Sequence, residues 1–266
     1  MLLSLFKTQP FLDESTTHWI IDTYEWALTQ FDGKEFINNT KLILPTGEFF
    51  PARVSSIEEM AQTVFDKSLE YAGMSKWPIK LVSPAIYQQN PQLQTMPQLH
   101  FENGVRGNEV SVTSTDFSPN AVNTVYVSFN PNQINQPQDL VASFGQSFAA
   151  ILIAQRGIAP PGGEEFMPQA IDLVACFLGF GVMFSNTAYQ FKGGCGSCYN
   201  KYANREVALP ENEILYCLAM FCVLKKIPIN HVKSHLKSHL RSDFKKAYKE
   251  LESKSKAQGL PLLSAN

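Results

Sequence analysis

Apolar residues recur at spacings of three and four in the first quarter of the chain, which predicts a helix over residues 15–31 and a second one ending near Ala72. The spacing Ser-x-x-Glu occurs twice just before the second helix, from Ser55 and from Ser56, and is typical of a capping box at a helix start. Between the two helices, the short apolar run 41–44 predicts a strand.

The pattern then changes to short β-prone runs separated by Pro, Asn and Gly, before helical spacing returns after Pro131. Strands are predicted over 79–82, 110–115 and 124–129, with a Gln/Asn/Pro-rich surface loop over 88–98. Helices are predicted near 138–155, 168–190, 211–226 and 229–254. We therefore expect an α+β fold with a small N-terminal mixed or antiparallel sheet and helices, followed by a mainly helical C-terminal half.

We expect one domain over 1–266, with an α/β portion to about 137, a helical portion over 138–256 and a flexible tail over 257–266. The composition, 44% hydrophobic and 17% charged with a net charge of -2, excludes a disordered chain, a fibre and a disulfide-stapled miniprotein. The five cysteines lie late in the chain and are odd in number, which favours a reducing compartment.

The N-terminus shows no export signal, and the longest apolar run, 173–184, is shorter than a membrane span and is predicted to be a buried core helix. We therefore expect a cytoplasmic protein without a membrane partner. Charge is uneven, because residues 225–256 hold ten Lys and Arg against three acids. A solvated basic face is the simplest interpretation, and a nucleic-acid contact is the less favoured alternative. His231, His235 and His239 would form a row on the same helix.

Two segments resemble an uncharacterised family of bacterial proteins related to the zincin metallopeptidases. The segment LVASFGQSFAAIL, residues 140–152, resembles LVATxAHELAHxL, and IDLVACFLGFG, residues 171–181, resembles TDLxAVFLGFG. The resemblance implies a zincin-like fold, in which an HExxH helix holds Zn²⁺ through two histidines and a glutamate acts as general base.

The residues that this resemblance aligns with the zinc site have lost its chemistry. The two histidines fall on Gln146 and Ala150, the general base on Ser147 and the later glutamate ligand on Pro168. These side chains supply neither a zinc site nor a base, so the positions are vestigial and no metal or other cofactor is expected. Asp172 is retained, and the resemblance implies that it is the acceptor that once held a ligand histidine. We expect it to be buried, with a backbone amide, a hydroxyl, Gln146 or Arg156 as its donor.

Two further motifs resemble catalytic or redox sites but have simpler structural explanations. The run Gly145–Ala149 resembles a serine-hydrolase elbow, but it lies in a predicted helix rather than after a strand. Cys195 and Cys198 form one CxxC in a Gly-rich stretch, and the pair is predicted to be free thiols or a local disulfide or metal clip. Cys217 and Cys222 are expected in the core.

The sequence therefore predicts a catalytically inactive, metallopeptidase-like protein with a binding or regulatory role towards an unknown protein or peptide. The candidate contact is the edge of the strand 124–129, at Tyr126 and Ser128, where a peptide could add as a strand. The alternatives are an enzyme or redox or metal protein using Cys195 and Cys198, and a nucleic-acid-associated protein using the basic helix. The sequence does not give the oligomeric state.

Overall fold

The computed structural model describes residues 9–51, 56–101, 104–108, 110–112, 124–188 and 204–258. The described part of the chain is mostly helical, with 63% helix, and its strands are short, so helices carry nearly all of the packing there. The coarse expectation of strands early and helices late holds, but the N-terminal half is itself largely helical.

The first three helices are α1 (Glu14–Gln30), α2 (Gly33–Asn38) and α3 (Ile57–Tyr71), which confirms both helices predicted for this region. Asp13 caps α1, because its Oδ1 accepts the N–H of Thr16 at 2.9 Å. Ser56 caps α3 by accepting the N–H of Glu59 at 3.0 Å, as the capping-box spacing predicts.

Among the described residues, the strands form two separate pairs rather than one sheet. β1 (Ile79–Leu81) pairs in parallel with β4 (Val125–Val127), and β2 (Leu99–Phe101) pairs antiparallel with β3 (Val110–Val112). Strand β2 was not predicted. The short helices α4 (Pro84–Gln89) and η1 (Pro91–Gln94) occupy most of the predicted loop 88–98. A Pro at the start of each helix explains this, since Pro is favoured in the first helical turn.

The strand predicted over 41–44 is wrong. These residues are extended but pair with no strand in the described part of the chain. Leu42, Ile43 and Leu44 are buried, and the N–H of Ile43 donates to the carbonyl of Gly179 at 2.9 Å. The apolar run therefore reflects packing against a helix rather than a place in a sheet.

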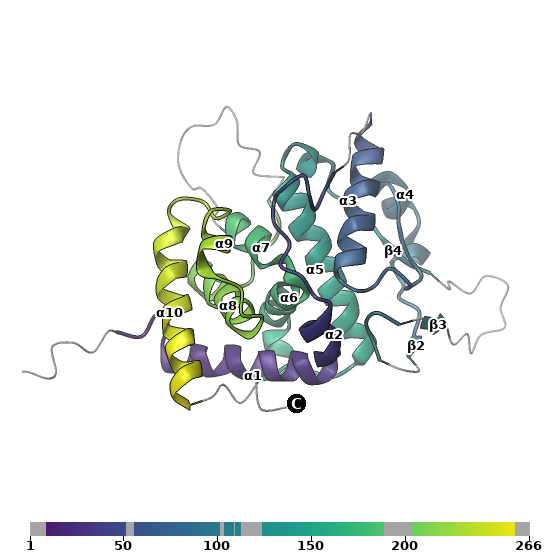
Figure 1. Cartoon of the computed structure of the whole chain (residues 1–266). Helices are drawn as coiled ribbons and strands as arrows, with labels where there is room; N and C mark the ends of the chain where they lie inside the picture. The colour runs from purple at the N-terminus through teal and green to yellow at the C-terminus, as the bar shows by residue number, and fades with distance from the viewer. Residues whose placement is uncertain are drawn as a thin grey trace, which may run out of the picture.

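The core is built around α5 (Pro137–Arg156), which follows η2 (Pro131–Asn135) and lies beside α3, α6 and α7 (Figure 1). After η3 (Glu164–Phe166), helices α6 (Met167–Ala175) and α7 (Gly181–Thr187) are joined by a π-helical turn, η4 (Cys176–Phe180). Helix α8 (Glu211–Leu224) covers α7, and α1 crosses beneath α6 in Figure 1.

The stretch Glu164–Thr187 is long and apolar enough to cross a membrane, with mean hydropathy 1.6, but 72% of its most apolar window is buried inside the protein. Packing against α5 and α8 accounts for that hydropathy. The predicted helix 168–190 is therefore a core helix interrupted by η4, and its last two residues lie outside the described residues.

The interruption falls at Gly179, whose φ of 103° is in the region that favours glycine. A Cβ there would lie 2.1 Å from the carbonyl oxygen of Lys41. The glycine thus lets the extended segment after α2 cross directly over η4.

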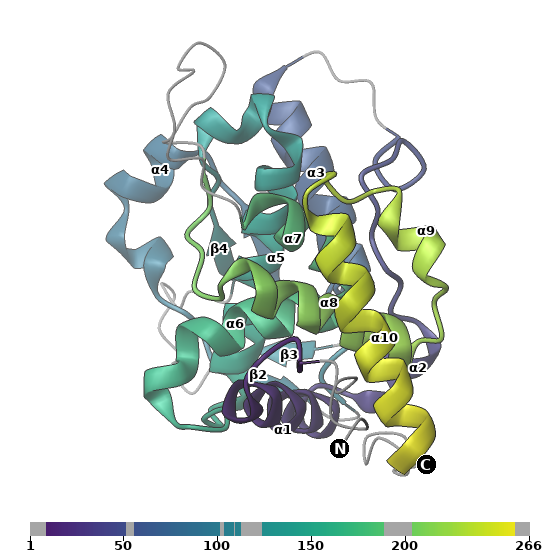
Figure 2. The same cartoon turned by 90° about the vertical axis from the view of Figure 1, so that its left-hand side faces the viewer.

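The predicted helix 229–254 is wrong as one element, because the chain forms α9 (Ile229–Lys233), a turn and then α10 (Leu240–Gln258). Asn186 on α7 explains the break: its side chain accepts the N–H of Lys237 at 3.0 Å and donates to the carbonyl of His235 at 2.9 Å. The same break interrupts the predicted row of His231, His235 and His239. His239 instead lies 3.4 Å from a carboxylate oxygen of Glu211. Figure 2 shows α10 lying along the outside of α8.

Candidate functional site

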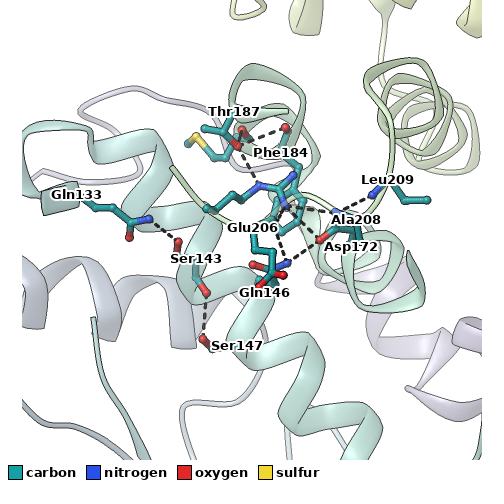
Figure 3. A network of polar contacts seen from close by, with 12 residues as sticks. Gln133, Ser143, Gln146, Ser147, Asp172, Phe184, Thr187, Glu206, Ala208 and Leu209 are labelled. Carbon is teal, nitrogen blue, oxygen red and sulfur yellow. Dashed lines mark hydrogen bonds and ion pairs between the residues drawn. The ribbon is translucent and has the colours of Figure 1, made fainter. Parts of the chain in front are cut away.

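Helices α5 and α6 meet at a polar pair inside an otherwise apolar contact. Gln146 on α5 donates from Nε2 to Oδ1 of Asp172 on α6 at 2.9 Å (Figure 3). Asp172 is completely buried, which confirms its expected burial and Gln146 as one of its donors. Arg156, another candidate donor, instead contacts Gln30 at 3.3 Å.

The segment 205–209, which we call the strap, lies over this pair. Arg205 places Nη1 3.2 Å and 3.3 Å from the two carboxylate oxygens of Asp172. The N–H groups of Ala208 and Leu209 donate to Oδ2 of Asp172 at 2.9 Å and 3.1 Å. Gln146 also reaches the strap by donating to the carbonyl of Glu206 at 3.0 Å. The strap is thus bound to both helices.

Arg205 is held on its other sides as well. Its Nε donates to the hydroxyl of Thr187 at 3.1 Å, and its guanidinium lies 4.0 Å from the centre of the Phe184 ring. Both partners of the Arg205–Asp172 ion pair have fully buried side chains. Burial of such a pair requires hydrogen bonds to its remaining polar atoms, and these are largely in place, although Nη2 of Arg205 is buried without a hydrogen-bond partner in the described residues.

Asp172 has no acceptor capacity left for chemistry. A carboxylate offers about four lone-pair directions. Donors from Gln146, Arg205, Ala208 and Leu209 fill them (Figure 3). To bind a metal ion, Asp172 would have to lose its contacts with the strap. The role of Asp172 in this network is therefore structural.

The other positions that the resemblance aligned with a zinc site do not join this network. Ser147 is half-buried and donates to the carbonyl of Ser143 on its own helix at 3.0 Å. Ala150 lies one turn after Gln146 on α5, as predicted, and is half-buried. Pro168 is exposed in the first turn of α6. Of the aligned positions, Gln146 and Asp172 contact each other in the structure, whereas Pro168 lies outside their network.

The residues present do not fit a zinc ion at this place. Zn²⁺ in proteins takes imidazole, thiolate or carboxylate ligands. Gln146, Ala150 and Pro168 supply none of these, and the one acid among the aligned positions, Asp172, is paired with a cation. Across the described ranges, no group of three or more His, Cys, Asp or Glu side chains is arranged to hold a metal ion.

The elbow-like run Gly145–Ala149 lies inside α5, so it is not a strand-to-helix turn. Gly145 instead allows close packing, since a Cβ there would lie 2.9 Å from the Phe180 ring. A nucleophilic serine would need a neighbouring base, and the Ser147 hydroxyl has a backbone carbonyl as its partner.

The candidate peptide-binding edge belongs to β4. The N–H of Val125 donates to the carbonyl of Pro78 at 2.8 Å. The carbonyl of Val127 accepts the N–H of Val82 at 2.9 Å. Lys80 pairs with Tyr126 in parallel register, so on β4 the backbone hydrogen bonds to β1 are made by Val125 and Val127. The N–H and C=O of Tyr126 therefore point away from β1. Ser128 is half-buried, and its hydroxyl donates to Val82 at 3.3 Å.

The surroundings of this edge are partly occupied, because η1 contacts β4. No residue in the described ranges hydrogen-bonds to the backbone of Tyr126. An unpaired strand edge is a template for another strand.

Cys195 and Cys198 lie outside the described residues. Cys176, Cys217 and Cys222 are free, buried thiols, as predicted for the last two. Burial raises the pKa of each of these three thiols, so they remain protonated and unreactive at neutral pH.

The sequence interpretation missed Arg205 altogether. Its partner Asp172 lies 33 residues earlier, and no periodic pattern links the two. The available signal was an arginine beside the short apolar run Val207–Leu209, which marks a segment that packs against a core.

The chain matches no protein-family model, no curated protein and no solved structure. The geometry of the site is therefore the basis for any statement about function.

Proposed function

We propose that this chain is a non-catalytic protein-binding module that receives an extended peptide along the outer edge of β4. The zincin resemblance is kept as the proposed origin of the α5–α6 pair. The single observation that carries the proposal is the saturated carboxylate of Asp172, because the one acid retained from the aligned zinc site is used to hold the strap.

In this proposal the outer edge of β4 is the surface that binds the peptide. Backbone hydrogen bonds give affinity when a peptide adds to a strand edge, and they need no metal. The backbones of Val125 and Val127 pair with β1, whereas both backbone groups of Tyr126 point away from β1 and can bond to a partner. The surface is short, so the partner is expected to make further side-chain contacts next to Tyr126.

A photo-crosslinking experiment tests the edge directly. We expect p-benzoylphenylalanine at position 126 to crosslink a partner in cells of the native host, while the same residue at Tyr87 does not. Tyr87 is a matched control, since it is also half-buried and lies on neighbouring α4. Mass spectrometry then identifies the partner and the crosslinked segment.

Proline substitution separates binding from folding. Tyr126→Pro removes an N–H that points away from β1, so the folded protein should persist while capture of the crosslinked partner is lost. Val127→Pro removes a ladder N–H and should destabilise the protein itself.

The second candidate is a nucleic-acid contact through α10, whose outer face exposes Lys245, Lys246 and Lys249. If Lys245→Glu and Lys249→Glu abolish partner capture while Tyr126→Pro retains it, the edge proposal is wrong and α10 is the functional surface.

A further inference from the structure

A cavity of about 570 Å³ lies between the end of α2 and the start of α9. In Figure 2 the segment that follows α2 runs upward beside α9. The volume is within the range of small-molecule sites, which is roughly 300–1,000 Å³. It lies outside the α5–α6 network and the β4 edge.

The two charged side chains in the described lining of this cavity, Lys41 and Lys225, are both cationic. Lys41, Lys225 and His231 line it, and no described carboxylate does. The larger cavity beside α10, of about 910 Å³, differs because Asp243 and Glu250 line it together with its lysines. A cavity with basic groups and no acid in its described lining favours an anion.

Lys225 keeps a donor available. Its Nζ donates to the carbonyls of Phe36 and Ile37, at 2.7 Å and 2.5 Å. These carbonyls belong to the last turn of α2, where a cation is favourable. An ammonium group has three donors, so one remains for a ligand.

A second cation lies behind the cavity wall. Arg106 is 1% exposed and donates from Nη1 to the hydroxyl of Thr40, a lining residue, at 3.2 Å. Its Nη2 is buried and has no hydrogen-bond partner. Burial lowers the pKa of Lys225, and the charge of Arg106 lowers it further, although Glu35 opposes the shift. The two cations repel each other, Glu35 and Asp32 offset part of this positive charge, and a bound anion would offset more of it.

The apolar wall consists of Leu42, Phe49 and Ile227. Two of these residues are fixed in place by hydrogen bonds to their backbones. The Tyr71 hydroxyl donates to the carbonyl of Phe49 at 2.6 Å, and the Tyr248 hydroxyl donates to that of Ile227 at 3.1 Å. The aromatic face of Phe49 suits a flat apolar group.

We propose that this cavity binds a small organic anion, a carboxylate or phosphate monoester carried on a flat apolar body. The acid group contacts Lys41, Lys225 and His231, while the body lies against Phe49 and Ile227. The proposal is independent of the β4 edge.

Calorimetric titration of the full chain tests it, with phenyl phosphate, benzoate, inorganic phosphate and neutral benzyl alcohol as probes. We expect phenyl phosphate or benzoate to bind at least about tenfold more tightly than benzyl alcohol, because charge pairing adds to the apolar contact. Inorganic phosphate should bind more weakly than phenyl phosphate, because it lacks the apolar body. Equal affinity for charged and neutral probes, or no binding, overturns the proposal.

Substitutions that introduce a carboxylate locate the site. Lys41→Glu and His231→Glu, with circular dichroism as a folding check, should each weaken phenyl phosphate binding by about tenfold or more. Lys245→Glu on α10 makes a similar change in net charge at an exposed position and should leave the affinity unchanged. If Lys245→Glu weakens binding as much as Lys41→Glu does, the effect is one of overall charge and the proposed site is wrong. Lys225 is left intact because it caps α2.

Discussion

Asp172 joins two helices and the strap through a single buried side chain. Removing it leaves the Arg205 cation and two backbone amides buried without their acceptor. We expect Asp172→Ala to lower the free energy of unfolding by about 3–5 kcal/mol, the usual cost of breaking a buried ion pair. Denaturant unfolding followed by circular dichroism measures the change.

The exposed Asp66 on α3 is the control for that substitution, since it accepts only a surface hydrogen bond from Gln62. Asp66→Ala should change the free energy of unfolding by less than about 0.5 kcal/mol. Equal effects at the two positions would mean that the strap contributes nothing to stability.

Gly179 is the residue whose backbone conformation decides how α6 and α7 join. Alanine there would strain a φ of 103° and bring its Cβ onto the Lys41 carbonyl. We expect Gly179→Ala to destabilise the protein by more than about 1 kcal/mol. Gly47→Ala, where a Cβ meets nothing within 4 Å, should be nearly neutral. A stable Gly179→Ala variant would contradict the observed crossing.

At the scale of elements, Glu250 ties α10 to α8 and to the chain before α1. Its carboxylate accepts from the N–H of Phe11 and from Lys254, both at 2.7 Å, and from the Tyr216 hydroxyl at 3.3 Å. Burial opposes ionisation, but these hydrogen bonds lower the pKa of Glu250 below its ordinary value of 4.5.

Because the folded pKa is the lower one, the stability that Glu250 contributes is present above about pH 4.5 and is lost as the pH falls through the folded value. Glu250→Gln should therefore flatten the acid side of the stability profile, measured as melting temperature against pH. Glu252→Gln, on the same helix, is the control. It should leave the dependence of melting temperature on acid pH as it is in the native protein.

The helices that sequence predicts well are those whose contacts are local. Asp13 and Ser56 act on their own helix starts, so the start signals of α1 and α3 can be read from neighbouring residues. The break between α9 and α10 depends on Asn186, which is 51 residues before Lys237, and no local pattern announces it.

At the scale of the whole molecule, the buried cysteines report on cooperative unfolding. Cys176, Cys217 and Cys222 come from η4 and α8, which share one core. In a Cys195→Ser/Cys198→Ser variant, we expect iodoacetamide to label these three thiols together, and only as the protein unfolds. Mass spectrometry across a denaturant series counts the labelled thiols. Labelling of one thiol in the folded protein would show that its helix opens alone.

The sequence by itself determined the helical character of the chain, the caps of its first helices and the burial of Asp172, and it named Gln146 as one of several possible donors to that acid. These features follow from periodicity, from side chains that act within one turn, and from the cost of burying a lone carboxylate. The tertiary structure alone decided that Arg205 and the strap complete the site, that the run 41–44 crosses η4 instead of joining a sheet, and that Lys225 and Arg106 converge behind one cavity. Each of these depends on contacts between residues far apart in the chain, which no local pattern encodes.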